Sequence, residues 1–116
     1  MEIRCFEDII AWQQARCLVA SVYGSMKDCR DFGFKDQIQR AAVSVMNNIA
    51  EGFERKGNKE FLQFLKISKG SCAEVCSMLY LAKDLGYLSE SDFVRISDQA
   101  KEVTRVLAGF IKYLRN

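Results

Sequence analysis

The chain of 116 residues is long enough for one hydrophobic core, and we expect a single domain over residues 1–116. Its hydrophobic share of 49% and charged share of 28% exclude a disordered chain, while a net charge of +2 is too small to indicate nucleic-acid binding by itself. Proline is absent from the sequence, which favours long uninterrupted helices because proline breaks a helix interior.

Hydrophobic periodicity predicts a first helix near residues 7–26 and a second near residues 34–55. Trp12 lies on the apolar face of the first helix, so we expect it in the core. The polar run at residues 27–31 indicates a loop between the two helices.

A third helix is predicted from Asn58, which follows Gly57 and would act as the N-cap, to Leu85, where Gly86 supplies the stop. The fourth helix starts after a Ser-x-x-Asp capping pattern at residues 89–92 and continues to the C-terminus. Because consecutive helices joined by short connections lie antiparallel, the sequence predicts an all-α, antiparallel up-down four-helix bundle.

The third helix is apolar over most of its circumference, whereas the fourth has one apolar face with basic residues opposite. A helix that is apolar nearly all round buries two sides, and a four-helix bundle covers only one of them. We therefore expect the other side to meet a second subunit. The residues that extend the apolar arc, and that we expect at this interface, are Ile67, Met78, Leu81 and Leu85.

The second helix carries a column of polar side chains opposite its apolar face. Arg40, Ser44, Asn47 and Glu51 follow one another at helical spacing. Such a column is typical of a solvated face or of hydrogen bonds between neighbouring helices or subunits, and a ligand-binding surface is the alternative.

No feature of the sequence predicts an enzyme. Histidine, the commonest general base near neutral pH and the commonest metal ligand, is absent, and the glycines form no phosphate-binding loop. Cys72 and Cys76 are four residues apart, but no further metal ligand is evident and both lie in the apolar arc of the third helix. We therefore expect buried, structural thiols, with no metal and no cofactor.

The five cysteines indicate reduced thiols, because their number is odd and their spacing irregular. No secretion signal is evident at the N-terminus, and no apolar run approaches the roughly 20 residues that span a bilayer. We expect a cytoplasmic protein that does not contact a membrane.

Two groups of basic residues are candidates for contacts with phosphate. One surrounds the turn between the second and third helices, and the other forms a stripe on the fourth helix. The turn group is more concentrated and is favoured narrowly, although nearby glutamates dilute it and plain solvation is the alternative. The turn group is Arg55, Lys56, Lys59 and Lys66, with Lys69 further along the same helix, and the stripe is Lys101, Arg105, Lys112 and Arg115.

Residues 37–55, QIQRAAVSVMNNIAEGFER, closely resemble the signature of a bacterial four-helix-bundle family named after proteins encoded in intervening sequences of 23S ribosomal RNA genes. Further matches are Phe6-Glu7-Asp8 leading to Trp12-Gln13, followed by residues 60–65, 70–71 and 85–88. The similarity covers nearly the whole chain.

The resemblance implies an up-down four-helix bundle that assembles as a ring-shaped homopentamer, which suits the doubly apolar third helix. Related accessory proteins of diversity-generating retroelements share this fold and bind a reverse transcriptase and nucleic acid. We therefore expect a non-enzymatic oligomeric accessory protein associated with RNA, supporting a reverse transcriptase or a process linked to ribosomal RNA. The alternative is a protein-interaction scaffold without direct nucleic-acid contact.

Overall fold

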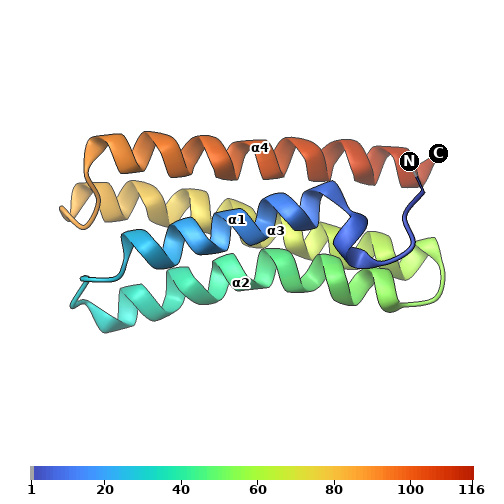
Figure 1. Ribbon diagram of the computed structural model, residues 1–116, viewed down its shortest axis with the longest axis horizontal. Helices are drawn as coiled ribbons and strands as arrows, with labels where there is room; N and C mark the ends of the chain where they lie inside the picture. Colours follow the sequence, from blue (N-terminus) through green and yellow to red (C-terminus); the bar gives the residue numbers. More distant parts are fainter. Residues whose placement is uncertain (1) are drawn as a thin grey trace.

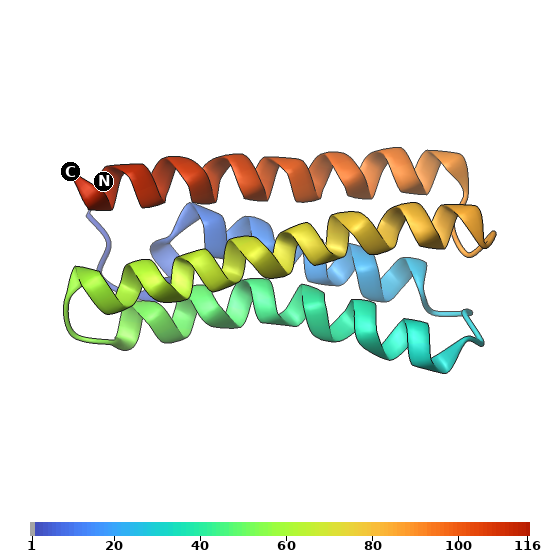
Figure 2. The ribbon, with the colours of Figure 1, turned by 180° about the vertical axis from the view of Figure 1, so that it is seen from behind.

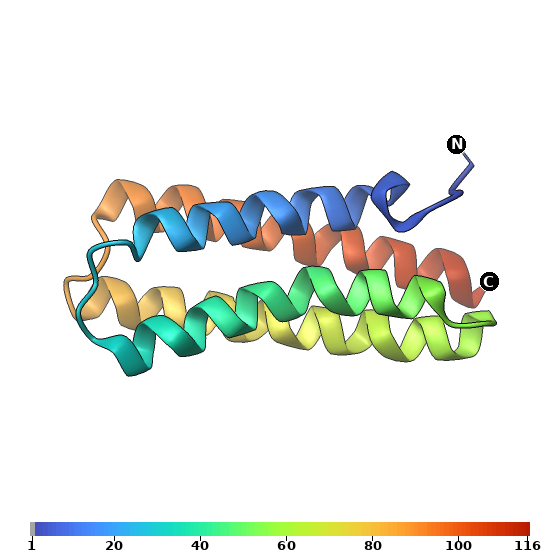
Figure 3. The same ribbon diagram turned by 60° about the horizontal axis from the view of Figure 1, so that its bottom comes forward.

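Four antiparallel helices form a bundle about 43 Å long and 22 Å by 19 Å across, in a computed structural model that describes residues 2–116 (Figure 1). Both chain ends lie at the end of the bundle that carries the α2–α3 turn (Figure 1, Figure 3). The predicted four-helix architecture is confirmed. The elements are a 3-10 turn η1 (Phe6–Asp8), α1 (Ile10–Ser25), α2 (Phe32–Glu54), α3 (Asn58–Asp84) and α4 (Glu90–Arg115).

The predicted ends of the third and fourth helices agree with the structure in all but one detail. Ser89 caps α4, and its side chain accepts a hydrogen bond of 3.1 Å from the backbone N–H of Asp92. Gly86 follows the end of α3 with a φ of +79°, a left-handed conformation that glycine adopts without strain. The prediction of Asn58 as the N-cap was wrong: Gly57 holds that position with a φ of +95°, and Asn58 is the first helical residue.

The first helix starts three residues later than predicted. The Asp8 carboxylate accepts a hydrogen bond of 3.0 Å from the backbone N–H of Arg4, and the intervening chain forms η1 instead of an α-helical turn. Ile9 is extended and buried, and α1 begins at Ile10. The η1 turn packs on the bundle through an edge-to-face contact of Phe6 with Trp12, whose ring centroids are 5.1 Å apart. Trp12 is in the core, as expected.

Each helix packs against two neighbours (Figure 2). Buried side chains from all four helices form one core that runs the length of the bundle. The contact between α2 and α3 is the most extensive, and the contact between α1 and α4 is the least extensive of the four helix–helix contacts. Leucine, isoleucine and valine side chains from all four helices are fully buried, for example Leu18, Ile49, Leu65 and Leu107. Their burial is the main stabilising contribution in a bundle of this kind.

Close approach of α2 and α3 depends on small residues. Gly52 is buried against α3, where a Cβ atom on it would lie 2.6 Å from the Cβ of Phe64. One helical turn after Phe64 on α3, the buried Ser68 hydroxyl donates a hydrogen bond of 2.6 Å to the backbone carbonyl of Val45 on α2. The two helices therefore pack at a separation that larger residues at these sites would not allow.

Candidate nucleic-acid interface

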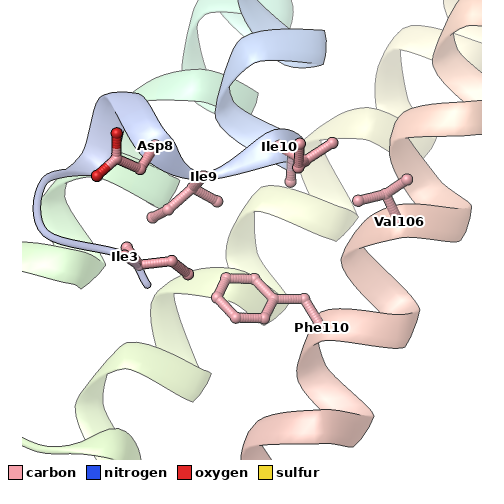
Figure 4. Close-up of a pocket in the computed structure, with 7 residues that line it drawn as sticks. Ile3, Asp8, Ile9, Ile10, Val106 and Phe110 are labelled. Atoms are coloured by element: carbon pink, nitrogen blue, oxygen red, sulfur yellow. The ribbon is translucent and has the colours of Figure 1, made fainter. Parts of the chain in front are cut away.

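A hollow of about 270 Å³ lies where η1 and the start of α1 meet α4, and its lining is mainly apolar (Figure 4). The ring of Phe110 points toward Ile3 and Ile9. Asp8 also lines this hollow, but its carboxylate points away from the apolar side chains. The backbone N–H of Arg4 hydrogen-bonds to Asp8 and lowers the pKa of its carboxyl. Because the Asp8 carboxylate is turned away and already hydrogen-bonded, the hollow presents mainly apolar side chains to a ligand.

A second hollow, of about 550 Å³, lies between α1 and α4 and has a mixed polar lining. The side-chain oxygens of Gln14 and Gln99 are buried there without a hydrogen-bond partner among the described residues. Two carboxylates and one guanidinium share the lining, so this groove does not favour an anion. Its lining residues are Gln13, Gln14, Cys17, Arg95, Asp98, Gln99 and Glu102.

A third hollow, of about 430 Å³, lies between α3 and the last turns of α4 and has a basic lining. Its charged residues are Lys66, Lys69 and Arg115, and no carboxylate lines it. Small residues on α3 leave room between the cations. The lining residues are Lys66, Lys69, Gly70, Ala73, Ile111 and Arg115. We call this hollow the basic groove.

The antiparallel register of α3 and α4 brings these cations together. The Cys72 thiol donates a hydrogen bond of 3.2 Å to the backbone carbonyl of Ala100, which places the middle of α3 beside the middle of α4. Lys66 precedes Cys72 along α3, and Arg115 follows Ala100 along α4, so the two cations meet at the same end of the bundle. The basic groove therefore combines Lys66 of the predicted turn group with Arg115 of the predicted stripe on the fourth helix.

Two arginines of the predicted groups are engaged by carboxylates instead. Arg55 forms an ion pair of 2.7 Å with Glu51, and its guanidinium lies over the ring of Phe64. Arg105 holds Glu102 through two hydrogen bonds, one of them 2.9 Å from Nε to Oε1, and these lower the pKa of the Glu102 carboxyl. Because their charge is already balanced, these arginines attract phosphate less than an unpaired cation does.

The remaining predicted cations are exposed but do not line the basic groove. Lys56 and Lys59 lie at the α2–α3 turn, and Lys101 and Lys112 lie on α4. Among residues 2–116 none of these four forms an ion pair, and neither do the three cations of the groove.

The residues predicted at a subunit interface divide into two kinds. Ile67, Leu81 and Leu85 are 52%, 46% and 49% exposed, so each presents apolar surface to its surroundings. Met78 is only 8% exposed and packs in the core of its own chain, which corrects its assignment to the interface. Exposed apolar surface on α3 is thus present, but it is narrower than the sequence pattern indicated.

The polar column of α2 makes hydrogen bonds within the chain. Ser44 and Ser71 hydroxyls lie 2.8 Å apart and join α2 to α3. Arg40 instead forms an ion pair with Asp36 of its own helix, Glu51 pairs with Arg55 directly after the end of α2, and Asn47 is exposed. Hydrogen bonding between neighbouring helices, one of the interpretations that the sequence left open, accounts for Ser44.

The paired cysteines of α3 differ in their surroundings. Cys72 is fully buried, as expected, whereas Cys76 is half-buried at the seam between α3 and α4, which corrects the expectation of two buried thiols. Within residues 2–116, histidine, cysteine and acidic side chains form no cluster of three that could hold a metal ion. None of the helices described here is long and apolar enough to cross a membrane.

Comparisons with known proteins identify relatives of this chain. The family model described as 23S rRNA-intervening sequence protein matches residues 7–109. A crystal structure of a protein of unknown function from the S23 ribosomal protein family of Bacteroides thetaiotaomicron superposes with a TM-score of 0.83 at 20% sequence identity. That superposition covers 89% of this chain and 99% of the other. The search of curated proteins found no significant match.

Proposed function

The chain belongs to the family of 23S rRNA-intervening sequence proteins, and from its basic groove we propose that it is a non-enzymatic accessory protein that associates with RNA. The observation that carries this proposal is the charged lining of the groove by Lys66, Lys69 and Arg115, without a carboxylate among the lining residues. Lysine and arginine contact phosphate oxygens without reading base sequence, so the proposed contacts position an RNA backbone.

A single chain with a net charge of +2 binds a polyanion weakly, and oligomerisation would multiply its groove. The proposed assembly is a ring-shaped homopentamer, in which five chains carry a net charge of about +10. The exposed side chains of Ile67, Leu81 and Leu85 support burial of this surface against another subunit. The exposed cations would then lie around one ring.

The resemblance to accessory proteins of diversity-generating retroelements and to proteins encoded in ribosomal RNA genes implies two roles for such an assembly: support of a reverse transcriptase on its RNA, or part in a process linked to ribosomal RNA. The second candidate function is a protein-interaction scaffold without nucleic-acid contact. The exposed apolar residues of α3 favour it, because they would bind another protein as readily as a further copy of the chain. RNA binding in solution separates the two functions.

The test measures affinity for a structured RNA over a salt series, using wild type and the triple variant Lys66→Ala, Lys69→Ala, Arg115→Ala. Wild-type binding should weaken steeply with salt because phosphate contacts release counterions. The triple variant should bind more weakly, with a smaller salt slope, because three cations per chain are missing.

The matched control removes three cations at the opposite end of the bundle: Lys27→Ala, Arg30→Ala and Lys35→Ala. It lowers the net charge by the same amount, so it should bind more tightly than the groove variant if the groove is the site. Equal losses in the two variants would reject the groove. Absence of binding by the wild type at low salt would reject RNA association and favour the scaffold.

A further inference from the structure

The apolar hollow and the polar hollow described above follow one another along the line where α1 meets α4. On α1, Ile10 lines the apolar hollow, and Gln14, one helical turn later, lines the polar one. On α4, which runs in the opposite direction, Val106 lines the apolar hollow and Glu102 lines the polar one. These two helices make the least extensive of the four helix–helix contacts, which leaves space along their junction. We call the two hollows together the α1–α4 groove.

Two hydrogen-bond donors of the polar half are already used. The side-chain amide of Gln13 donates a hydrogen bond of 2.8 Å to the backbone carbonyl of Glu7. The guanidinium of Arg95 donates to the Asp92 carboxylate at 3.3 Å and to the Ser21 hydroxyl at 3.4 Å. The acceptors of these bonds do not line the hollow, so both donors are held by residues outside it.

Acceptors of the same half are free. The side-chain oxygens of Gln14 and Gln99 are buried without a hydrogen-bond partner among the described residues. Asp98 forms no ion pair within residues 2–116, whereas Glu102 is held by Arg105 through two hydrogen bonds. A buried acceptor without a donor costs free energy, and the terminal torsion of a glutamine is soft. A donor that enters the hollow can therefore bond to either amide oxygen after a turn of that amide.

The charge of the polar half favours a cation. Its lining carries two carboxylates and one guanidinium. The ion pair with Arg105 balances Glu102, and the ion pair with Asp92 balances Arg95, so the Asp98 carboxylate is left uncompensated. A guanidinium carries a positive charge and five N–H donors in a planar fork, so it can serve more than one of the free acceptors.

The other half of the α1–α4 groove suits apolar groups. Ile3 and Ile10 are exposed there, and the ring of Phe110 points toward Ile3 (Figure 4). Covering these side chains with apolar groups of a partner removes them from water and is favourable. The groove as a whole therefore fits a partner with a cation at one end and apolar side chains at the other.

The length of the groove indicates a peptide segment. Its lining residues on α4 run from Arg95 to Phe110, which corresponds to about 22 Å at 1.5 Å per residue. Both of the walls described here are mainly helical, so an extended segment would find no strand edge in them to pair with. A helical segment satisfies its own backbone groups and can lie between the two walls.

We propose that the α1–α4 groove docks an amphipathic helical segment of a partner protein. An arginine of the segment lies in the polar half, where it bonds to the free acceptors beside Asp98, and its leucine or isoleucine side chains cover the apolar half. The groove shares no lining residue with the basic groove or with the exposed apolar side chains of α3. Docking therefore goes beyond RNA association and requires neither RNA nor the proposed ring.

The probe is a designed helical peptide of about 16 alanine and glutamine residues, long enough to span the groove. It carries two leucines one turn apart and an arginine about two turns later on the same face. A second peptide has glutamate in place of the arginine. Fluorescence anisotropy with a neutral dye measures binding of each peptide to the full-length protein. The arginine peptide should bind about fivefold or more tightly than the glutamate peptide.

Variants of the protein test the two halves separately. Asp98→Lys should bring the affinity for the arginine peptide down to that for the glutamate peptide, because it replaces the free carboxylate with a cation. Ile10→Gln should weaken both peptides, because it removes apolar surface from the other half. The matched control is Asp28→Lys, which makes the same change of charge at an exposed position between α1 and α2 and should bind like wild type.

Three results would overturn the proposal. Equal affinity of the two peptides, or no binding of the arginine peptide at millimolar concentration, would mean that the polar half holds only water. Unchanged affinity in Asp98→Lys, or an equal loss in Asp28→Lys, would place the peptide elsewhere. Light scattering tests a second copy as the occupant: Asp98→Lys and Ile10→Gln should keep the wild-type mass, and a lower mass would assign the groove to contact between copies of the chain.

Discussion

Gly52 of α2 lies so close to Phe64 of α3 that a Cβ atom on the glycine would come within 2.6 Å of the Phe64 Cβ. The ring of Phe61 is also near, with its Cδ1 atom 3.0 Å from the same point. The first of these neighbours is attached directly to the backbone and cannot turn away. The separation of α2 and α3 at this end of the bundle is therefore set by the absence of a side chain at residue 52.

Gly52→Ala should lower the free energy of unfolding by about 1–3 kcal/mol, because the added methyl group forces the two helices apart. The control is Gly109→Ala in α4, where a Cβ meets nothing within 4 Å. That change should stabilise the protein by about 0.5–1 kcal/mol through helix propensity. Denaturant unfolding measures both, and equal stability of the two variants would contradict the packing argument.

The link between Asp31 and Tyr87 should make stability depend on acid pH. The Tyr87 hydroxyl donates a hydrogen bond of 2.7 Å to the Asp31 carboxylate, and this bond, followed by that from the Phe34 backbone N–H, lowers the pKa of Asp31 below its ordinary value of 3.8. A carboxyl with a lowered pKa in the folded state stabilises the fold above its unfolded pKa, and this contribution is lost as pH falls through the folded pKa.

Thermal unfolding of wild type and Asp31→Asn from pH 6 to pH 2 checks this dependence. Asparagine keeps an oxygen that can cap α2 but cannot ionise. The difference in stability between the two proteins should shrink as pH falls below about 4, and Tyr87→Phe should reduce it at neutral pH. A difference that stays constant over the whole range would rule out titration of Asp31 as its cause.

The exposed residues of α3 predict the outcome of interface mutations. Wild type should give a mass five times 13.3 kDa by light scattering if the proposed pentamer forms. Leu81→Lys with Leu85→Lys should lower that mass while circular dichroism stays helical, because neither leucine is in the core. The corresponding control on α4 is Val94→Lys with Tyr113→Lys. A wild-type monomer at micromolar concentration would reject the oligomer.

Met78 offers a contrast that separates assembly from folding. Met78→Lys should destabilise the single chain by a few kcal/mol, because it places an unpaired charge among core side chains. In thermal denaturation, Met78→Lys should lose its helical signal at a lower temperature than the variant with Leu81→Lys and Leu85→Lys. If Met78→Lys remained as stable as wild type, the assignment of this residue to the core would be wrong.

Much of the fold could be predicted because its signals are local. The Ser89 cap and the glycine at position 86 act within one turn of chain, and each marks a helix end wherever the helix lies in space. The η1 turn could not be predicted in this way. It depends on the Asp8 side chain reaching back to Arg4, and no periodic pattern reports such a bond.

The basic groove could be predicted only in part, because it depends on the register of two helices. Lys66 and Arg115 are 49 residues apart in sequence, and only the alignment of Cys72 with Ala100 brings their ends of α3 and α4 together. The pairing of Arg105 with Glu102 could have been inferred from their spacing of three residues. Recognising that pair would have removed Arg105 from the candidate phosphate contacts.

The weak contact between α1 and α4 has a consequence for the order of folding. The other three neighbouring pairs are consecutive in sequence and close through short loops, so the entropy of closure is small. In contrast, α1 and α4 are separated in sequence by the whole of α2 and α3, so bringing them together closes a long loop. Their contact is also the least extensive of the four helix–helix contacts. We therefore expect the α2–α3 hairpin to form first during folding, and the α1–α4 seam to open first in native-state amide exchange.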